Sequence, residues 1–313
     1  MQLTPIEFPT HTRLVFGAGV AAQVGPLAQE LGAQKILLVT DAGIVAAGHA
    51  GRVIASLEAA GLRVTVFDQA KENPTTKCVA ECVAVAWEAG VDFLIGLGGG
   101  SSMDTAKGCN FILTNGGQMK DYWGVGKATK PMLPFIAIPT TAGTGSEMQC
   151  AALIADEITH QKMACLDPKC AARVAILDPE LTISQPPRVT ACTGIDAIAH
   201  AVETAVTTKR NELSQKLSTE AFKLCLNAFP LVMQSPENLV ARAQMQREDP
   251  AILDLEALQD VRFRFTGRAD HEEAVDSFDA VPLGFAHGVF RTAALLRHAV
   301  EKRQPSRLKL GDD

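Results

Sequence analysis

Short apolar runs alternate with helical patterns over the first 180 residues of the chain. The runs typical of buried strands are Lys35–Thr40, Leu62–Phe67, Phe93–Leu97 and Phe135–Pro139. Between them, Ala50–Ala60 and Thr76–Ala89 place apolar residues at the spacing of one helix face. Because strands and helices take turns along the chain, the pattern predicts βαβ units and an α/β fold with a mostly parallel sheet.

The pattern changes beyond Pro187. Thr190–Val206 and Ser214–Met233 are rich in Ala and Leu and predict long helices. The segment Asp178–Leu181, followed by Pro186 and Pro187, is typical of a link between domains. We therefore expect an N-terminal α/β domain over residues 1–180 and a C-terminal all-helical domain over residues 181–313.

Composition narrows the class of protein. The 313 residues are 47% hydrophobic and 20% charged, a globular balance, and the net charge of −6 comes without a basic patch, which argues against nucleic-acid binding. No apolar run approaches the roughly 20 residues that span a bilayer, and the N-terminus lacks the pattern of a signal peptide, so the expected location is the cytoplasm. Eight cysteines without a Cys-x-x-Cys pair predict reduced, mostly buried thiols.

A glycine-rich turn follows the strand that ends at Leu97. Gly98, Gly99 and Gly100 allow close approach of a ligand to the backbone, and the helix that begins at Ser101 and Ser102 offers free N–H groups. This arrangement suits a pyrophosphate, although it is neither G-x-G-x-x-G nor a Walker loop. The alternative is a tight turn between strand and helix with a serine as the N-cap.

A second polar loop, Pro139–Glu147, also follows a strand. Thr140, Thr141 and Thr144 offer hydroxyl groups beside bare glycine backbone. Nucleotides bind open parallel sheets at the carboxyl ends of the strands, so both loops are candidates for one site. The alternative is an ordinary flexible turn.

Asp41 directly follows the strand Lys35–Thr40. A carboxylate there can accept hydrogen bonds from ribose hydroxyls and would repel a 2′-phosphate, which favours NAD over NADP. The alternative role of Asp41 is to cap the next helix.

Asp196 and His200 lie four residues apart in a predicted helix, so both side chains project from one face. A carboxylate and an imidazole at this spacing can hold a divalent cation. Two ligands are too few, since a catalytic site has at least three protein ligands, and the alternative is a solvent-facing contact between the two side chains.

Together these residues resemble the iron-containing (group III) alcohol dehydrogenase family. The matching segments are Gly98–Ser101 with Asp104 and Lys107, Pro139–Glu147, and Thr193–Gly194 with Asp196, His200 and Glu203, and weaker agreement comes from Asn73–Thr75, Lys162, Asp178–Pro179 and Leu181. The resemblance runs from about Phe16 to about Gln246.

The resemblance implies a dinucleotide-binding N-terminal domain and a helical, metal-binding C-terminal domain. The residues expected to bind the cofactor are Asp41, Asn73, Gly98, Gly99, Gly100, Ser101, Ser102, Asp104, Thr140, Thr141, Thr144, Lys162 and Leu181. The metal, Fe²⁺ or alternatively Zn²⁺, is expected on Asp196, His200 and two further histidines. The implied reaction is hydride transfer between a primary alcohol or aldehyde and NAD(P), with the metal as Lewis acid; the resemblance suggests a homodimer.

Three other interpretations remain at this point. Glycerol dehydrogenase and dehydroquinate synthase are related zinc enzymes, although the spacing of Asp196 and His200 favours the iron-type branch. The chain is alternatively a non-catalytic nucleotide-binding remnant, or an α/β protein of flavodoxin-like type without NAD. No individual catalytic residue can be assigned from the sequence.

The end of the chain differs from the rest. Of the last 67 residues 23 are charged, against 41 of the first 246, and His287-Gly288 lacks the Asn of the family pattern His-Gly-x-x-Asn. His271 and His287 are candidate ligands by residue type only. We hypothesise that the segment after about residue 246 is an out-of-frame or replaced end of a family gene. If no reading frame of the coding DNA there encodes His-rich, Ala/Gly-rich helices, this hypothesis fails.

Overall fold

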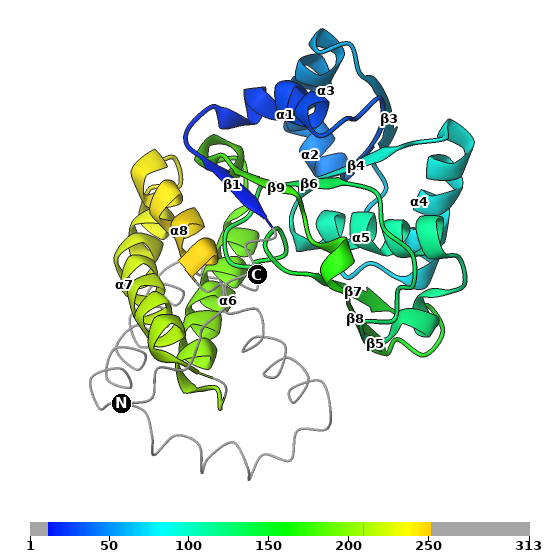
Figure 1. The fold of residues 1–313 in the computed structure, drawn as a ribbon. Helices are drawn as coiled ribbons and strands as arrows, with labels where there is room; N and C mark the ends of the chain where they lie inside the picture. Colours follow the sequence, from blue (N-terminus) through cyan, green and yellow to red (C-terminus); the bar gives the residue numbers. More distant parts are fainter. Residues whose placement is uncertain (1–11, 209, 252–313) are drawn as a thin grey trace, which may run out of the picture. The chain divides into compact units, whose positions relative to one another are not determined.

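The computed structural model describes residues 12–208 and 210–251, which all belong to one compact unit of the chain, Met1–Arg262 (Figure 1). A six-stranded sheet forms its centre, with the order β1-β9-β6-β4-β2-β3 and every neighbouring pair parallel. Its strands are β1 (Arg13–Phe16), β2 (Lys35–Val39), β3 (Arg63–Phe67), β4 (Phe93–Gly98), β6 (Phe135–Pro139) and β9 (Val174–Leu177). The central strands are buried on both faces, which explains why they are continuous apolar runs rather than alternating ones.

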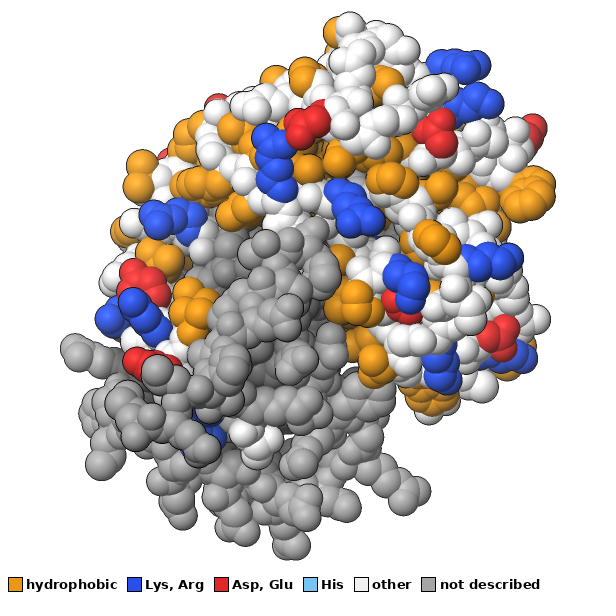
Figure 2. Space-filling model, in the orientation of Figure 1, with side chains coloured by type: hydrophobic (Ala, Val, Ile, Leu, Met, Phe, Trp, Pro, Cys, Tyr) orange, Lys and Arg blue, Asp and Glu red, His pale blue; other side chains and the backbone are white. Residues whose placement is uncertain are grey.

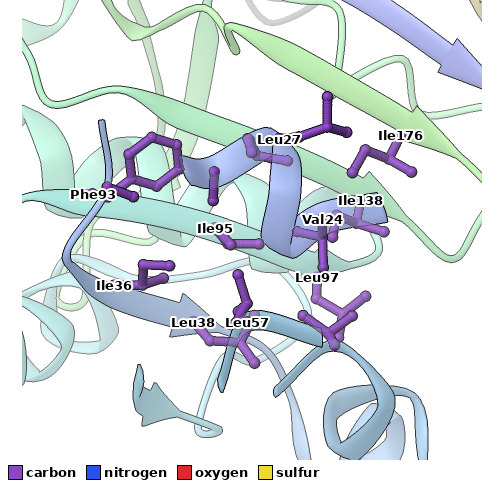
Figure 3. Packing of buried hydrophobic residues seen from close by; sticks show 14 of the residues in the cluster. Val24, Leu27, Ile36, Leu38, Leu57, Phe93, Ile95, Leu97, Ile138 and Ile176 are labelled. Atoms are coloured by element: carbon purple, nitrogen blue, oxygen red, sulfur yellow. The ribbon is translucent and has the colours of Figure 1, made fainter. Parts of the chain in front are cut away.

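Helices cover both faces of this sheet. The helices of the α/β part are α1 (Val24–Glu30), α2 (Ala42–Ala46), α3 (His49–Ala59), α4 (Thr76–Ala89) and α5 (Gly100–Asn115), with η1 (Val20–Gln23) before α1. Side chains of α1 and α3 pack on one face; Figure 3 shows Val24, Leu27 and Leu57 against Ile36 and Ile95 of the strands. The helices α4 and α5 pack on the opposite face, because successive strand residues point to opposite sides.

The predicted elements are confirmed, and so is the α/β class. The helix predicted over Thr76–Ala89 and the strand predicted over Phe135–Pro139 have these bounds, and the other predicted strands and helices shift by one to three residues. The largest shift is in α6, which begins at Pro187 instead of Thr190, because proline is well tolerated in the first turn of a helix. The division of the chain into two domains at residue 180 stays a prediction.

A second, three-stranded sheet was not predicted. It consists of β5 (Gly124–Val125), β7 (Ala151–Ala155) and β8 (Lys162–Leu166) in the order β5-β8-β7, with short 3-10 helices η2 (Met119–Tyr122) and η3 (Pro168–Cys170) nearby. The strands β7 and β8 form an antiparallel pair. Apolar side chains of this sheet share a buried cluster with α5 and η2, so the sheet covers the side of α5 that faces away from the main sheet.

Three helices follow the last strand of the main sheet. After η4 (Pro179–Thr182) come α6 (Pro187–Val206), α7 (Glu212–Gln234) and α8 (Leu239–Ala251). A Cβ atom at Gly194 would lie 2.3 Å from the ring of Phe229, so glycine lets α6 and α7 approach closely. The guanidinium of Arg242 in α8 donates to Gln185 Oε1 at 3.2 Å and to Thr190 Oγ1 at 3.3 Å. These contacts connect α8 to the start of α6.

The loop after β6 touches α6 directly. A Cβ atom at Gly143 would lie 2.0 Å from the carbonyl oxygen of Thr193 and 3.2 Å from Cβ of Ala197. The φ angle of Gly143 is +125°, a conformation that side chains rarely adopt. The absence of a side chain at this position therefore brings a loop of the α/β part against α6.

The surface and the cysteines agree with the composition. Among the described residues, no helix is long and apolar enough to cross a membrane. Figure 2 shows charged side chains of both signs scattered over the visible face of these residues. All eight cysteines are free thiols, and seven are buried, as predicted; Cys192 is exposed.

We predict that Gly143→Ala separates the loop from α6. The added methyl group meets main-chain atoms of Thr193, which cannot move aside as a flexible side chain can, and the φ angle adds strain. The expected loss is about 2–4 kcal/mol of unfolding free energy, measured by urea denaturation. Gly51→Ala is the matched control, because a Cβ atom there meets nothing within 4 Å and the position is helical. Equal stability of the two variants would contradict the tight contact.

His49 ties α3 to the segment before α6. Its Nε2 lies 2.6 Å from Ser184 Oγ, and Arg52 donates to its Nδ1 at 2.5 Å. Because arginine can only donate, Nδ1 accepts and the proton resides on Nε2, which donates to the serine hydroxyl. Burial and then the charge of Arg52 lower the pKa of His49, and the carboxylate of Asp178 opposes this shift.

The lowered pKa of His49 predicts a loss of stability on acidification. Below about pH 6.5 the unfolded chain binds a proton at this histidine while the folded chain does not, so the unfolding free energy falls as the pH falls towards the folded pKa. His49→Gln is expected to flatten this part of the profile in urea unfolding measured between about pH 7.5 and 5.5. His160→Gln, in an exposed turn, should leave the slope as it is. A slope that survives His49→Gln would refute the assignment.

Candidate functional site

The carboxyl ends of β2, β4 and β6 lie side by side. Val39 pairs with Gly96, and Gly98 pairs with Pro139, so the loops after these strands meet at one edge of the sheet. The strand β3, which follows β2 in the chain, pairs with β2 on one side. The next strand, β4, pairs with β2 on its other side. Such a reversal of strand order opens a crevice between the loops, which is where α/β sheets bind ligands.

The turn after β4 is shaped by its glycines. Gly98 has a φ of +147°, and a Cβ atom there would lie 2.4 Å from Ser102 Oγ. Gly99 is the N-cap of α5 and has no side chain to occupy the N–H groups of the first turn. The alternative in which a serine caps this helix is therefore wrong. The first turn of α5 can offer its N–H groups and its partial positive charge to an anion.

The threonine loop faces this turn. A Cβ atom at Gly99 would lie 3.4 Å from Thr141 Cγ2, and one at Gly100 would lie 3.3 Å from Thr144 Cβ. The two loops are also joined by the N–H of Thr140, which donates to the carbonyl of Gly98 at 2.9 Å. Thr141 Oγ1 is buried without a hydrogen-bond partner in the described part of the chain. A phosphate oxygen bound at the glycine turn would accept the hydrogen bond that this buried hydroxyl can donate.

Asp41 has two roles in the structure. Its Oδ1 accepts a hydrogen bond from the N–H of Ile44 at 3.1 Å, so its role as the cap of α2 is confirmed. Its Oδ2 accepts from Ser102 Oγ at 3.4 Å and lies 3.3 Å from the position of a Cβ atom at Gly98. Asp41 therefore lies beside the glycine turn, where the sequence placed a ribose partner.

Asn73, Ser101 and Lys162 come together from three separate segments. The N–H of Asn73, whose φ is +54°, donates to Ser101 Oγ at 3.3 Å. The ammonium of Lys162, on β8, donates to Asn73 Oδ1 at 3.3 Å. A positive side chain thus lies at the rim of the glycine turn, which suits an anionic ligand.

Asp104 and Leu181 lie in the interior. Asp104 Oδ1 accepts from Ser146 Oγ at 2.8 Å, and its Oδ2 accepts from the N–H of Leu153 at 3.3 Å. Leu181 is 2% exposed and belongs to the hydrophobic core of the sheet. A contact of either residue with a cofactor stays a prediction.

Asp196 and His200 share one face of α6, as expected. His200 Nε2 lies 3.6 Å from Asp196 Oδ1, and the side chain of His200 is 7% exposed while that of Asp196 is 49% exposed. The contact of Gly143 with Thr193 and Ala197 lies on the same helix, so the pair is within one turn of the threonine loop.

The donors for a metal ion are incomplete within the described residues. In residues 12–208 and 210–251, no group of three or more His, Cys, Asp or Glu side chains is placed to hold a metal ion. His271 and His287 lie outside the described residues, and so does most of the segment expected to be atypical. The pair Asp196 and His200 supplies two donors, one fewer than a metal site requires.

Lys107 and Ser146 were part of the matched motifs but received no role from the sequence. Lys107 is 1% exposed and donates to Ser146 Oγ at 3.1 Å, which links α5 to the threonine loop. The sequence did contain a signal for this link. Asp104 and Lys107 lie three residues apart on a helix with apolar neighbours, and two buried charges in such a place need a polar partner that both can reach.

The comparisons with known proteins agree with this geometry. Residues 11–179 match iron-containing alcohol dehydrogenase, and residues 190–248 match the C-terminal part of the Fe-containing alcohol dehydrogenase family. The match ends close to residue 246, where the sequence resemblance was expected to fade.

Three relatives illustrate the likeness. The NAD-dependent methanol dehydrogenase of Bacillus methanolicus is 38% identical over 231 residues, which cover 74% of this chain and 61% of that protein. The crystal structure of a 1,3-propanediol oxidoreductase has a TM-score of 0.77 at 30% identity, covering 81% of this chain and 66% of that one. Sulfoacetaldehyde reductase from Bifidobacterium kashiwanohense, solved in complex with NAD⁺, has a TM-score of 0.73 at 30% identity and covers 80% and 66%. Both parts of the family match this chain, and the sheet, the two loops and the pair Asp196 and His200 agree with that match. The chain belongs to the iron-containing alcohol dehydrogenase family.

Proposed function

We propose that the chain binds NAD at the carboxyl ends of β2, β4 and β6 and is built to transfer hydride between a primary alcohol or aldehyde and that cofactor. The carrying observation is that the glycine turn and the threonine loop face each other while Gly143 of the same loop touches α6. These contacts support a site in which the nucleotide and the reacting groups would meet. The relatives are named for methanol, 1,3-propanediol and sulfoacetaldehyde. These names support an alcohol or aldehyde as the substrate.

The residues of the crevice fit a dinucleotide. The first turn of α5 and the hydroxyl of Thr141 would hold the pyrophosphate, with Lys162 at the rim. The carboxylate of Asp41 would accept hydrogen bonds from ribose hydroxyls and disfavours a 2′-phosphate, which supports NAD over NADP. The cofactor, when bound, supplies the hydride acceptor or donor, and the chain supplies its orientation.

We propose Asp196 and His200 as two ligands of a divalent cation, Fe²⁺ by family resemblance and Zn²⁺ as the alternative. The buried imidazole and the half-exposed carboxylate leave one side of the pair open. When bound, the cation would lower the pKa of an alcohol oxygen as a Lewis acid. The remaining ligands have to come from outside the described residues, where His271 and His287 are candidates by residue type.

A non-catalytic nucleotide-binding protein is the second candidate function. It is favoured by one observation: the described residues include both loops proposed to bind the nucleotide, but no group of three or more metal donors is placed together among them. The two candidates share the NADH site and differ in metal retention, and a zinc enzyme of the glycerol dehydrogenase type would differ from both in its metal.

Thr141→Val is expected to weaken NADH binding about tenfold while stabilising the unliganded protein by about 1 kcal/mol. The variant keeps the shape of the side chain and removes a buried hydroxyl that has no hydrogen-bond partner among the described residues and that a phosphate oxygen would satisfy. Isothermal titration calorimetry with NADH and urea unfolding measure the two effects.

The matched control for Thr141→Val is Thr204→Val. Thr204 Oγ1 is also buried without a partner among the described residues, but it lies on α6 away from the glycine turn. This control should gain stability without losing affinity. If Thr141→Val binds NADH as tightly as the unmodified chain does, the threonine loop is not part of the nucleotide site.

For the metal, we expect Asp196→Asn and His200→Ala to lower Fe²⁺ or Zn²⁺ content and alcohol-dependent NADH formation at least about tenfold, with NADH affinity little changed. Metal content by mass spectrometry and a coupled absorbance assay provide the readouts. Cys192→Ser is the control, because this exposed thiol lies one turn before Asp196 on the same helix. An unmodified chain that binds NADH but retains no metal would favour the non-catalytic candidate.

A further inference from the structure

The side chain of Lys107 is among the largest that are fully buried in the described residues. It lies in the middle of α5, a helix that is buried along most of its length between the two sheets. An ammonium group in such a place is costly unless each of its N–H bonds finds an acceptor. The partners of Lys107 therefore indicate what the charge is kept for.

All acceptors of Lys107 lie in one short segment. Its Nζ donates to the carbonyls of Ser146 at 2.5 Å, Gln149 at 2.8 Å and Ala151 at 3.0 Å, and to the hydroxyl of Ser146 at 3.1 Å. Three main-chain carbonyls that converge on one ammonium hold residues 146–151 in a single conformation. This segment directly follows the threonine loop.

Asp104 completes the arrangement one turn earlier on α5. The hydroxyl of Ser146 donates to Asp104 Oδ1 at 2.8 Å, and the N–H of Leu153 donates to Oδ2 at 3.3 Å. Ser146 thus accepts from the ammonium and donates to the carboxylate. The two buried charges compensate each other through this shared hydroxyl.

The threonine loop is consequently fixed at both ends to the glycine turn and its helix. At its start, the N–H of Thr140 is bonded to the carbonyl of Gly98; at its end, Ser146 is bonded to Asp104 and Lys107 of α5. The first turn of α5 is the proposed pyrophosphate site. The two halves of the nucleotide crevice are therefore held by one helix.

We propose that Lys107 and Asp104 are positioning residues for the dinucleotide: through their hydrogen bonds to Ser146 they hold residues 140–145 at the distance from α5 that the cofactor requires. This inference rests on the proposed function and adds to it the residues that preorganise the site. A lysine with a merely structural role would affect global stability and leave the affinity of the folded protein for NADH unchanged.

Lys107→Met tests the proposal in the full chain, because methionine keeps much of the length and loses the charge. The expected result is an NADH dissociation constant raised about tenfold or more, measured by calorimetry at a temperature where the variant is folded. Lys216→Met, at an exposed position of α7, is the control and should bind NADH as the unmodified chain does. A folded Lys107→Met variant with unchanged affinity overturns the proposal.

Chemical rescue separates positioning by hydrogen bonds from the filling of space. In Lys107→Ala, added ethylammonium can donate to the three carbonyls, whereas tetramethylammonium fills space without any N–H group. Restored NADH affinity with ethylammonium alone supports the proposal. Equal rescue by both ions, or no rescue by ethylammonium in the folded variant, overturns it.

If the Lys107 variants do not fold, Ser146→Ala decides. It removes the shared hydroxyl but leaves the ammonium its three carbonyl acceptors, so the fold has support. We expect the NADH affinity of the folded variant to fall several-fold, with a lowered melting temperature because Asp104 loses a buried hydrogen bond; unchanged affinity of the folded variant overturns the proposal. Failure of the proposed function is distinguishable, because then the unmodified chain would not bind NADH either.

Discussion

A helix buried on nearly every side must satisfy the charges it carries from within the protein. The helix α5 carries a carboxylate and an ammonium three residues apart, and both side chains are buried. Their common partner is the hydroxyl of Ser146, with main-chain groups of the following residues completing the set. Since the same helix begins at the glycine turn, the need to satisfy buried charge also determines where the threonine loop lies relative to the proposed phosphate site.

The absence of a side chain at Gly143 is the second constraint on which the proposed site depends. With any other residue at position 143, the loop could not approach the carbonyl of Thr193 as closely as it does. The helix α6, which presents Asp196 and His200, is thereby brought to the loop that faces the nucleotide crevice. One loop thus contacts both the glycine turn and α6. Hydride transfer requires cofactor and substrate to meet, and this double contact is the geometric basis on which they could.

The fold was largely predictable because its strands are continuous apolar runs and its helices have a clear periodicity. The glycine turn, the threonine loop and the pair on α6 were recognisable for a similar reason: each is local in sequence and placed at the end of a strand or on one helix face. The hairpin of β7 and β8 was missed because its strands are short, and their burial depends on packing against α5. The partners of Lys107 could not be predicted either, since they are main-chain carbonyls about 40 residues away. Asp41 illustrates the limit: its predicted role as a helix cap is confirmed, its hydrogen bond with Ser102 was not predicted because the two residues are far apart in sequence, and its contact with a ribose stays a prediction.

The two halves of the site differ in how much of the chain they require. The proposed nucleotide site draws mainly on residues between Asp41 and Lys162, which are joined by hydrogen bonds to one another. The two proposed cation ligands, Asp196 and His200, both lie on α6, and a complete metal site needs further donors from outside the described residues. The proposed dinucleotide binding is thus separable from the proposed hydride chemistry, because the hydrogen bonds described for the glycine turn and for the buried charges of α5 do not involve Asp196 or His200. Among the described residues, the contact of Gly143 with α6 connects the loop of the proposed nucleotide site to the helix that carries the proposed cation ligands, so it is a route by which the two sites could be coupled.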